Sequence, residues 1–123
     1  MKTATVKTQE ACVNMLRPVR DALEVLQGKW KLPILVSLTF GEKRFTDIAK
    51  DVDGITDRML SKELRDLELN DLVKRTVETG YPVKITYSLT AHSKSLDDVI
   101  ESLRTWGIMH KKKLAADCKK HRK

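Results

Sequence analysis

The sequence predicts a mainly helical α+β domain in which two short helices are followed by a two-stranded antiparallel hairpin. Three observations carry this prediction. Apolar residues recur with the helical period over residues 45–52 and 57–67. A glycine-containing tetrapeptide separates these two segments. Residues 83–89 alternate between apolar and polar side chains, as a half-buried strand does. At 123 residues the chain is long enough for one domain with a core, but not for two.

The N-terminal part of the chain predicts three helices. A short helix is expected from Gln9 and is interrupted at Pro18, because a proline inside a helix lacks the amide that the helix needs. Proline suits the first turn of a helix, so a second helix is expected from Pro18 to about Leu26. A third helix carries Trp30 in its apolar stripe, as a core anchor, and is expected to end at Gly41.

A helix, a tight turn and a second helix are expected over about residues 45–69. The apolar face of the first helix consists of Phe45, Ile48, Ala49 and Val52. Gly54 suits the turn, and the hydroxyl of Thr56 is placed to cap the helix that follows. This arrangement is a helix-turn-helix.

The second helix of this pair has two chemically distinct sides. Its apolar stripe consists of Met59, Leu60, Leu64 and Leu67. Its opposite side carries Arg58, Ser61, Lys62 and Arg65. Such a side suits the major groove of DNA, where Arg and Lys reach guanine edges or hold phosphates. The alternative is an ordinary solvated helix face, and the preceding helix and turn favour the DNA interpretation.

Residues 72–77 and 83–89 predict a hairpin, because the link between them is short. In the second strand, Ile85, Tyr87 and Leu89 are expected to be buried, and Lys84, Thr86 and Ser88 to be exposed. A hairpin that directly follows a helix-turn-helix is a wing. We expect Arg75 and Lys84 to approach phosphates of a duplex; the alternative is that these two cations only face water.

A long helix is expected over about residues 91–114, with Thr90 as its N-cap and Leu114 near its end. Its apolar side consists of Leu96, Val99, Ile100, Leu103, Trp106, Gly107, His110 and Leu114. At 1.5 Å per residue this helix is about 35 Å long, more than one small winged domain covers. An uncovered apolar helix calls for a partner, and the simplest partner is a second copy around a two-fold axis.

The net charge of +7 comes mostly from the C-terminal segment. Residues 111–123 contain seven Lys or Arg and one Asp, whereas residues 1–110 contain 17 basic and 16 acidic side chains. Residues 115–123 are expected to form a disordered basic tail that adds either nonspecific attraction to DNA or only solubility. The case for DNA binding therefore depends on where the charges lie, and not on their total.

Several function classes find no support in the sequence. No apolar run approaches the roughly 18 residues of a membrane span, and the N-terminal residues lack a long apolar signal segment, so a cytoplasmic protein is expected. Nucleophile elbows, phosphate loops and clustered metal ligands are absent, so we expect no enzyme, no metal and no cofactor. Cys12 and Cys118 are far apart in the sequence and are expected to be reduced thiols.

Motifs along the chain resemble a known family. They are Gly28-Lys29-Trp30, Lys43-Arg44-Phe45, Gly54-Ile55-Thr56, Met59-Leu60, Leu64-Arg65-Asp66-Leu67-Glu68, Tyr87-Ser88-Leu89-Thr90 and Trp106-Gly107. Over about residues 18–110 they resemble, in register, the HxlR-type winged helix-turn-helix transcriptional regulators. The resemblance implies a bacterial homodimer that binds operator DNA, with the terminal helices as dimer interface and the second helix of the pair in the major groove.

The resemblance and the residue pattern together assign roles to specific residues. The expected DNA contacts are Arg44, Thr56, Arg58, Ser61, Lys62 and Arg65, with Arg75 and Lys84 on the wing. The expected dimer contacts are Val13, Leu16, Leu96, Val99, Ile100, Leu103, Trp106 and His110. The expected operator is pseudo-palindromic, with half-sites about one helical turn apart or a multiple of it.

Two alternatives stay open within this fold. Many family members carry a cysteine immediately before the proline, where this chain has Arg17, and in some members that cysteine senses oxidants. Cys12 is the candidate replacement in a thiol-responsive regulator, although a packed, unreactive thiol is also expected there. A small apolar effector is the other candidate signal, near Trp30 and Trp106. The second alternative is a winged-helix protein–protein module that does not bind DNA.

Overall fold

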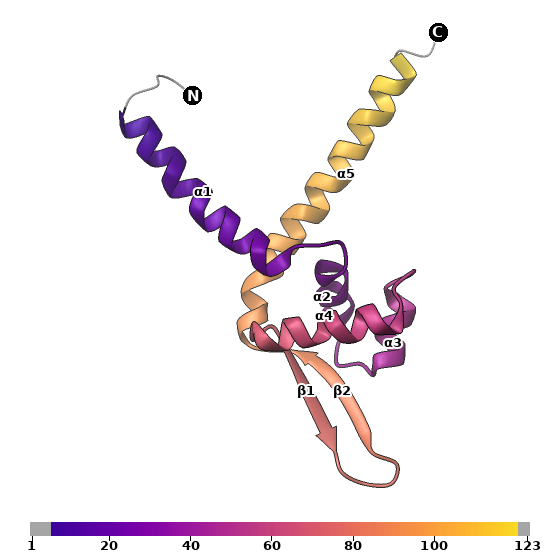
Figure 1. Cartoon of the computed structure of the whole chain (residues 1–123). Coiled ribbons are helices and arrows are strands. Elements are labelled where there is room, and N and C mark those ends of the chain that lie inside the picture. The colour runs from indigo at the N-terminus through magenta and orange to yellow at the C-terminus, as the bar shows by residue number, and fades with distance from the viewer. Residues whose placement is uncertain (1–5, 121–123) are drawn as a thin grey trace.

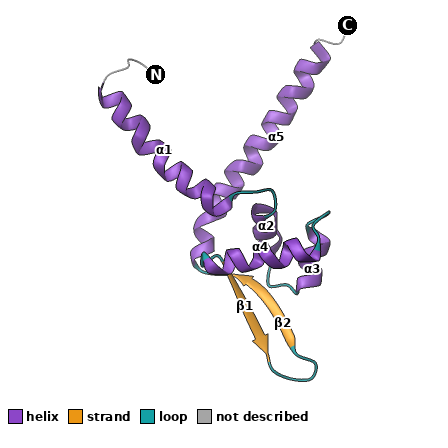
Figure 2. Ribbon diagram, viewed as in Figure 1, coloured by secondary structure: helices purple, strands orange, loops and turns teal. Residues whose placement is uncertain are grey.

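The structure is a computed structural model that describes residues 6–120. The elements are α1 (Val6–Leu26), α2 (Lys31–Thr39), α3 (Phe45–Asp51), α4 (Asp57–Leu69), β1 (Val73–Glu78), β2 (Lys84–Leu89), the 3-10 helix η1 (His92–Leu96) and α5 (Asp97–Lys120). Figure 1 shows α2, α3 and α4 gathered into a body from which α1 and α5 diverge, while the β1–β2 hairpin extends on the opposite side. The predicted mainly helical α+β fold, a winged helix-turn-helix, is confirmed (Figure 2).

The core lies between α2, α3, α4 and the start of the wing. Its buried apolar residues are Ile34, Leu35, Leu38, Ile48, Val52, Leu60, Leu64, Leu67, Leu72 and Val73. Each fully buried Leu or Ile contributes about 1.5–3 kcal/mol to folding. The helical period predicted the members of this set that precede Leu72. Trp30, just before α2, packs against the core from its edge and is half-buried, as expected of an anchor there.

The turn between α3 and α4 has the predicted chemistry. Gly54 adopts a φ of +89°, a left-handed conformation that residues with a Cβ rarely adopt. The backbone amide of Met59 donates to the hydroxyl of Thr56 at 3.1 Å, so Thr56 caps α4. The side chain of Met59 is an exception to the predicted stripe: it is 37% exposed, because it lies at the edge of that stripe.

The hairpin has the predicted antiparallel pairing, with Arg75 opposite Tyr87 and Glu78 opposite Lys84. Lys43, ahead of α3, forms an isolated bridge to Tyr87 on the other edge of β2, with N···O distances of 2.9 and 2.8 Å. The expected exposure of Thr86 is wrong, because this side chain is buried. In addition to β1, β2 contacts α2, α3 and η1. The side chains of β2 therefore do not simply alternate between a solvent-exposed face and a buried face.

The expected break at Pro18 is also wrong. Residues Val6–Leu26 form one helix with Pro18 inside it. The proline removes one backbone donor, but the helix extends for several turns on both sides of it, and these turns keep their own hydrogen bonds.

The C-terminal helix begins later and ends later than expected. Thr90 does not cap the long helix: it precedes Ala91, the N-cap of η1, and its hydroxyl accepts a hydrogen bond from the amide of Ser93 in η1. The α-helix begins at Asp97, where two acidic residues favour a helix N-terminus. It continues to Lys120, so residues 115–120 are helical and do not form a disordered tail. An ion pair of 3.1 Å between Lys113 and Asp117, one turn apart, supports this extension. Residues 121–123 lie outside the described range.

Candidate nucleic-acid interface

The exposed side of α4 carries the residues that were expected to contact DNA. Arg58, Ser61, Lys62 and Arg65 are all exposed, on the side away from the core. Together with Thr56 and Met59 they line one shallow depression. The core contacts of Leu60, Leu64 and Leu67 fix the rotation of the helix, so this polar side faces solvent.

The three cations on this side differ in their surroundings. Within the part of the chain that the structure describes, Arg58 and Arg65 form no ion pair. Lys62 lies near two carboxylates of its own helix: its ammonium is 3.6 Å from Asp66 and 4.0 Å from Glu63. Arg58 and Arg65 therefore present uncompensated positive charge, whereas the charge of Lys62 is partly compensated.

A buried ion pair lies beneath this surface and joins α4 to α2. The ammonium of Lys31 donates to Glu63 at 2.7 Å, and Asp66 lies 3.5 Å away. Burial opposes the charged form of Lys31, but the hydrogen bond to Glu63 and the charges of Glu63 and Asp66 raise the pKa of Lys31 above its ordinary value of 10.5. The pair thus holds the first turn of α2 against the middle of α4.

The sequence contained a signal for this pair that the apolar pattern alone does not reveal. Glu63 follows Leu60 by three residues and precedes Leu67 by four, so it lies within the apolar stripe of α4. A carboxylate at such a position predicts a buried cation nearby, because an unpaired buried charge is costly. Lys31, at the start of an apolar helix, is that cation.

The two wing cations that were expected to approach DNA, Arg75 and Lys84, do not share a face of the hairpin. Arg75 lies opposite Tyr87, and both belong to the face that carries the buried Val73. Arg75 lines a second depression with Ser61, Arg65 and Glu68 of α4. Lys84 lies opposite Glu78 on the other face of the hairpin. Only Arg75 is therefore adjacent to the cationic side of α4.

Arg44 lies directly before α3, at its N-cap position. Its side chain is exposed, and its carbonyl accepts hydrogen bonds from the amides of Asp47 and Ile48 at 3.1 Å each. The backbone of Arg44 thus begins α3, while its guanidinium stays available to a ligand.

The residues expected at a dimer interface fall into two groups. The exposed group is Val13, Leu16, Val99, Leu103 and Trp106, each between 44% and 55% exposed. The other group already has contacts within this chain. Leu96 and Ile100 pack against the core, and His110 stacks on Trp106 with 4.6 Å between the ring centroids. Large apolar side chains that a single chain leaves in water are the ones that need a partner.

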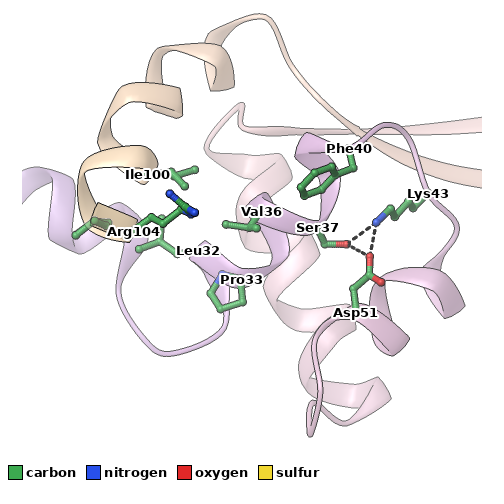
Figure 3. A pocket seen from close by; sticks show the side chains of 10 residues that line it. Leu32, Pro33, Val36, Ser37, Phe40, Lys43, Asp51, Ile100 and Arg104 are labelled. Carbon is green, nitrogen blue, oxygen red and sulfur yellow. Dashed lines mark hydrogen bonds and ion pairs between the residues drawn. The ribbon is translucent and has the colours of Figure 1, made fainter. Parts of the chain in front are cut away.

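A pocket of about 730 Å³ lies between α2 and α5 (Figure 3). Its lining residues are Leu32, Pro33, Val36, Ser37, Phe40, Lys43, Asp51, Ile100, Leu103 and Arg104. Trp30 and Trp106 do not line this pocket, but Trp106 lines a separate depression on α5 with Thr105 and Met109. An effector near the two tryptophans stays a prediction.

One end of this pocket contains a polar triad. The hydroxyl of Ser37 donates to Asp51 at 2.7 Å, and the ammonium of Lys43 donates to Asp51 and, at 3.4 Å, to Ser37 (Figure 3). The hydrogen bonds from Lys43 and Ser37 lower the pKa of Asp51 below its ordinary value of 3.8. The triad joins α2, the bridge residue Lys43 and the end of α3.

Cys12 and Cys118 are both exposed free thiols. The expectation that Cys12 is packed is wrong for the single chain, because among the described side chains of α1 the apolar residues that pack against the core are Val25 and Leu26. Among residues 6–120 there is no group of three or more His, Cys, Asp or Glu side chains that could hold a metal ion. None of the helices in that range is long and apolar enough to cross a membrane.

Comparisons with known proteins agree on one family. A family model described as HxlR-like helix-turn-helix matches residues 25–115. Over 99 residues, or 80% of this chain and 79% of the relative, the chain is 36% identical to YtcD, an uncharacterized HTH-type transcriptional regulator of Bacillus subtilis.

Two solved structures are similar over most of their length. The redox regulator HypR in its reduced form has a TM-score of 0.76 and 34% identity, covering 80% of this chain and 98% of HypR. Diamide-treated YodB from Bacillus subtilis has a TM-score of 0.65 and 31% identity, covering 76% of this chain and 92% of YodB.

Proposed function

This chain belongs to the HxlR-like helix-turn-helix family and is a transcriptional regulator, and from that premise we propose that it acts as a homodimer that binds operator DNA. In this proposal one α4 helix enters the major groove at each of two half-sites of a pseudo-palindromic duplex. The proposal includes that it acts on this DNA in the cytoplasm of a bacterial cell. We do not propose a catalytic activity for this chain, because its relatives are named as transcriptional regulators.

The observation that carries the proposal is the exposed cationic side of α4. Arg58 and Arg65 present uncompensated guanidinium groups from the second helix of a helix-turn-helix. Guanidinium groups on such a helix bind guanine edges bidentately or hold phosphates. Arg75 on the neighbouring wing face adds a third cation beside the same depression, where it is suited to hold a phosphate.

Homodimerisation is supported by the apolar side chains that the single chain leaves exposed. Leu103 and Trp106 on α5, and Leu16 on α1, are all at least half exposed. The two helices that carry them diverge from the body on the side away from the wing (Figure 1). A second copy related by a two-fold axis would cover these side chains and leave both α4 helices facing outward.

Selection of bound sequences from a pool of random duplexes tests this function. The expected result is a symmetric motif whose half-sites are about 10–10.5 base pairs apart, or a multiple of that spacing. A pool that shows no enrichment, or a motif without symmetry, would overturn the proposal. No enrichment is also the outcome expected of a protein–protein module that does not bind DNA.

A triple variant then assigns the contact to α4. R58Q/K62Q/R65Q is expected to lose operator binding while the dimer mass is unchanged. Its matched control is K111Q/K112Q/K113Q, which removes three exposed lysines from α5 and is expected to bind the operator nearly as the unmodified protein does. Unchanged binding by the α4 variant would refute the assignment.

A thiol response is the second candidate function, favoured by the exposure of Cys12 and by its similar structures, a redox regulator and a diamide-treated protein. The test compares operator binding by the unmodified protein and by C12S after treatment with diamide. Release from DNA only when Cys12 is present supports this candidate. The same response by C12S removes the role from Cys12, and a C118S variant then tests the other thiol.

A further inference from the structure

We infer that Asp66 sets how much Lys62 contributes to DNA binding, and that it thereby limits the affinity of α4 for duplexes of arbitrary sequence. This inference rests on the proposed function, since it concerns the same surface of α4. It makes Asp66 a specificity-determining residue that acts through Lys62.

The geometry around Asp66 is shared between two lysines. Its Oδ2 atom lies 3.6 Å from the ammonium of Lys62 and 3.5 Å from the ammonium of Lys31. Lys62 is the exposed neighbour, with 64% of its side chain in solvent, whereas only 8% of the Lys31 side chain is exposed. One carboxylate therefore joins an exposed surface cation to a buried one.

The buried Lys31–Glu63 pair keeps Asp66 on α4. Asp66 therefore stays beside Lys31 when the side chain of Lys62 extends away from the helix. Lys31 is held by Glu63 at 2.7 Å, and both side chains are almost fully buried. Glu63 also lies 4.0 Å from the ammonium of Lys62. If Lys62 reaches towards a phosphate, both carboxylates stay behind on α4 and repel that phosphate.

The four charges of this cluster, Lys31, Lys62, Glu63 and Asp66, sum to zero, whereas Arg58 and Arg65 have no such compensation. Nonspecific affinity for duplex DNA comes mainly from cations that displace counterions from phosphates. Lys62 therefore adds less to nonspecific binding than either arginine does. The affinity for the operator is reduced less, because Arg58 and Arg65 stay free to contact base edges.

The test measures binding of the full chain to a duplex of random sequence over a range of salt concentrations. D66N is expected to steepen the dependence of log K on log salt by about one unit, the contribution of one additional phosphate contact. With a slope steeper by one unit, a fourfold rise in salt concentration lowers the affinity of D66N about fourfold more than it lowers the affinity of the unmodified protein. The ratio of operator affinity to random-duplex affinity is expected to fall by a similar factor.

Two comparisons isolate the role of Lys62. D21N removes one negative charge from α1, away from the cationic side of α4, at an exposed residue without an ion pair in the described chain, and is expected to change the slope much less than D66N. In a K62M background, D66N is expected to have no effect on the slope. Equal effects of D66N and D21N, or a full effect of D66N without Lys62, would overturn the inference.

A change in the fold is distinguished by D66E, which keeps the carboxylate. D66E is expected to retain the shallow salt dependence, and thermal unfolding of D66N reports whether the Lys31 site is disturbed. If D66E behaves as D66N does, then packing rather than charge is responsible, and the inference fails. A protein that binds no duplex at low salt in any variant would instead refute the proposed function.

Discussion

The ammonium of Lys31 lies 2.7 Å from a carboxylate oxygen of Glu63, with only 8% and 6% of the two side chains exposed. Removing one partner leaves the other as an unpaired buried charge, so K31M is expected to lower the free energy of unfolding by about 3–5 kcal/mol. Denaturation by urea measures this loss. The control is K31M/E63L, which removes both charges and is expected to recover most of the stability; a double variant as unstable as K31M would contradict the prediction.

The same pair predicts a loss of stability at alkaline pH. Because the pKa of Lys31 is raised in the folded chain, its stabilisation is fully present below the ordinary value of 10.5 and is lost as the pH rises through the folded pKa. The difference in unfolding free energy between the unmodified protein and K31M is therefore expected to shrink above pH 10.5. A difference that stays constant across this range would argue against a charged Lys31.

Asp51 predicts the opposite dependence, at acid pH. Its pKa is lowered by hydrogen bonds from Lys43 and Ser37, so its stabilisation is present above the ordinary value of 3.8 and is lost as the pH falls through the folded pKa. D51N is expected to be less stable than the unmodified protein at neutral pH and to approach it below pH 3.8. Denaturation at several pH values measures this convergence, and D53N, at another exposed carboxylate nearby, serves as control.

Replacing an exposed apolar residue on α5 tests the proposed dimer. L103R is expected to convert the protein to a monomer, because a guanidinium would have to be desolvated at the interface. Operator affinity should fall by more than tenfold, since the two half-sites no longer bind together. Light scattering measures the mass. L69R, at an exposed leucine at the end of α4, is the control and should stay dimeric.

The two faces of the wing predict different contributions to DNA binding. Arg75 lies beside Ser61 and Arg65, so R75Q is expected to reduce the salt slope of operator binding by about one unit. Lys84 lies on the other face, and K84Q is expected to have the smaller effect. A larger effect of K84Q would show that the wing meets DNA through the face opposite Arg75.

The sequence predicted those parts of the fold that depend on local periodicity. The core residues Leu60 and Leu64, the turn at Gly54 and the Thr56 cap each follow from spacing along one segment. The same spacing predicted which side of α4 is exposed. The contact of that side with DNA stays a prediction.

The features that the sequence did not predict depend on contacts between distant segments. Thr86 is buried because helices from elsewhere in the chain pack near β2, and alternation along one strand carries no information about them. The Lys31–Glu63 pair joins residues 32 positions apart. At Pro18, a general rule about proline was outweighed by the length of helix on both sides.

The isolation of α1 has a consequence for how this protein folds. Residues 9–24 are all exposed in the single chain, and Val25 and Leu26 are the apolar residues among the described side chains of α1 that pack against the core. Most helices in proteins draw their stability from packing of an amphipathic face, and here the chain itself provides almost none. In the proposed homodimer, ordering of residues 9–24 therefore depends on the second copy, so the melting temperature is expected to rise with protein concentration, and dilution is expected to expose Arg17 and Arg20 to trypsin before the rest of the molecule unfolds.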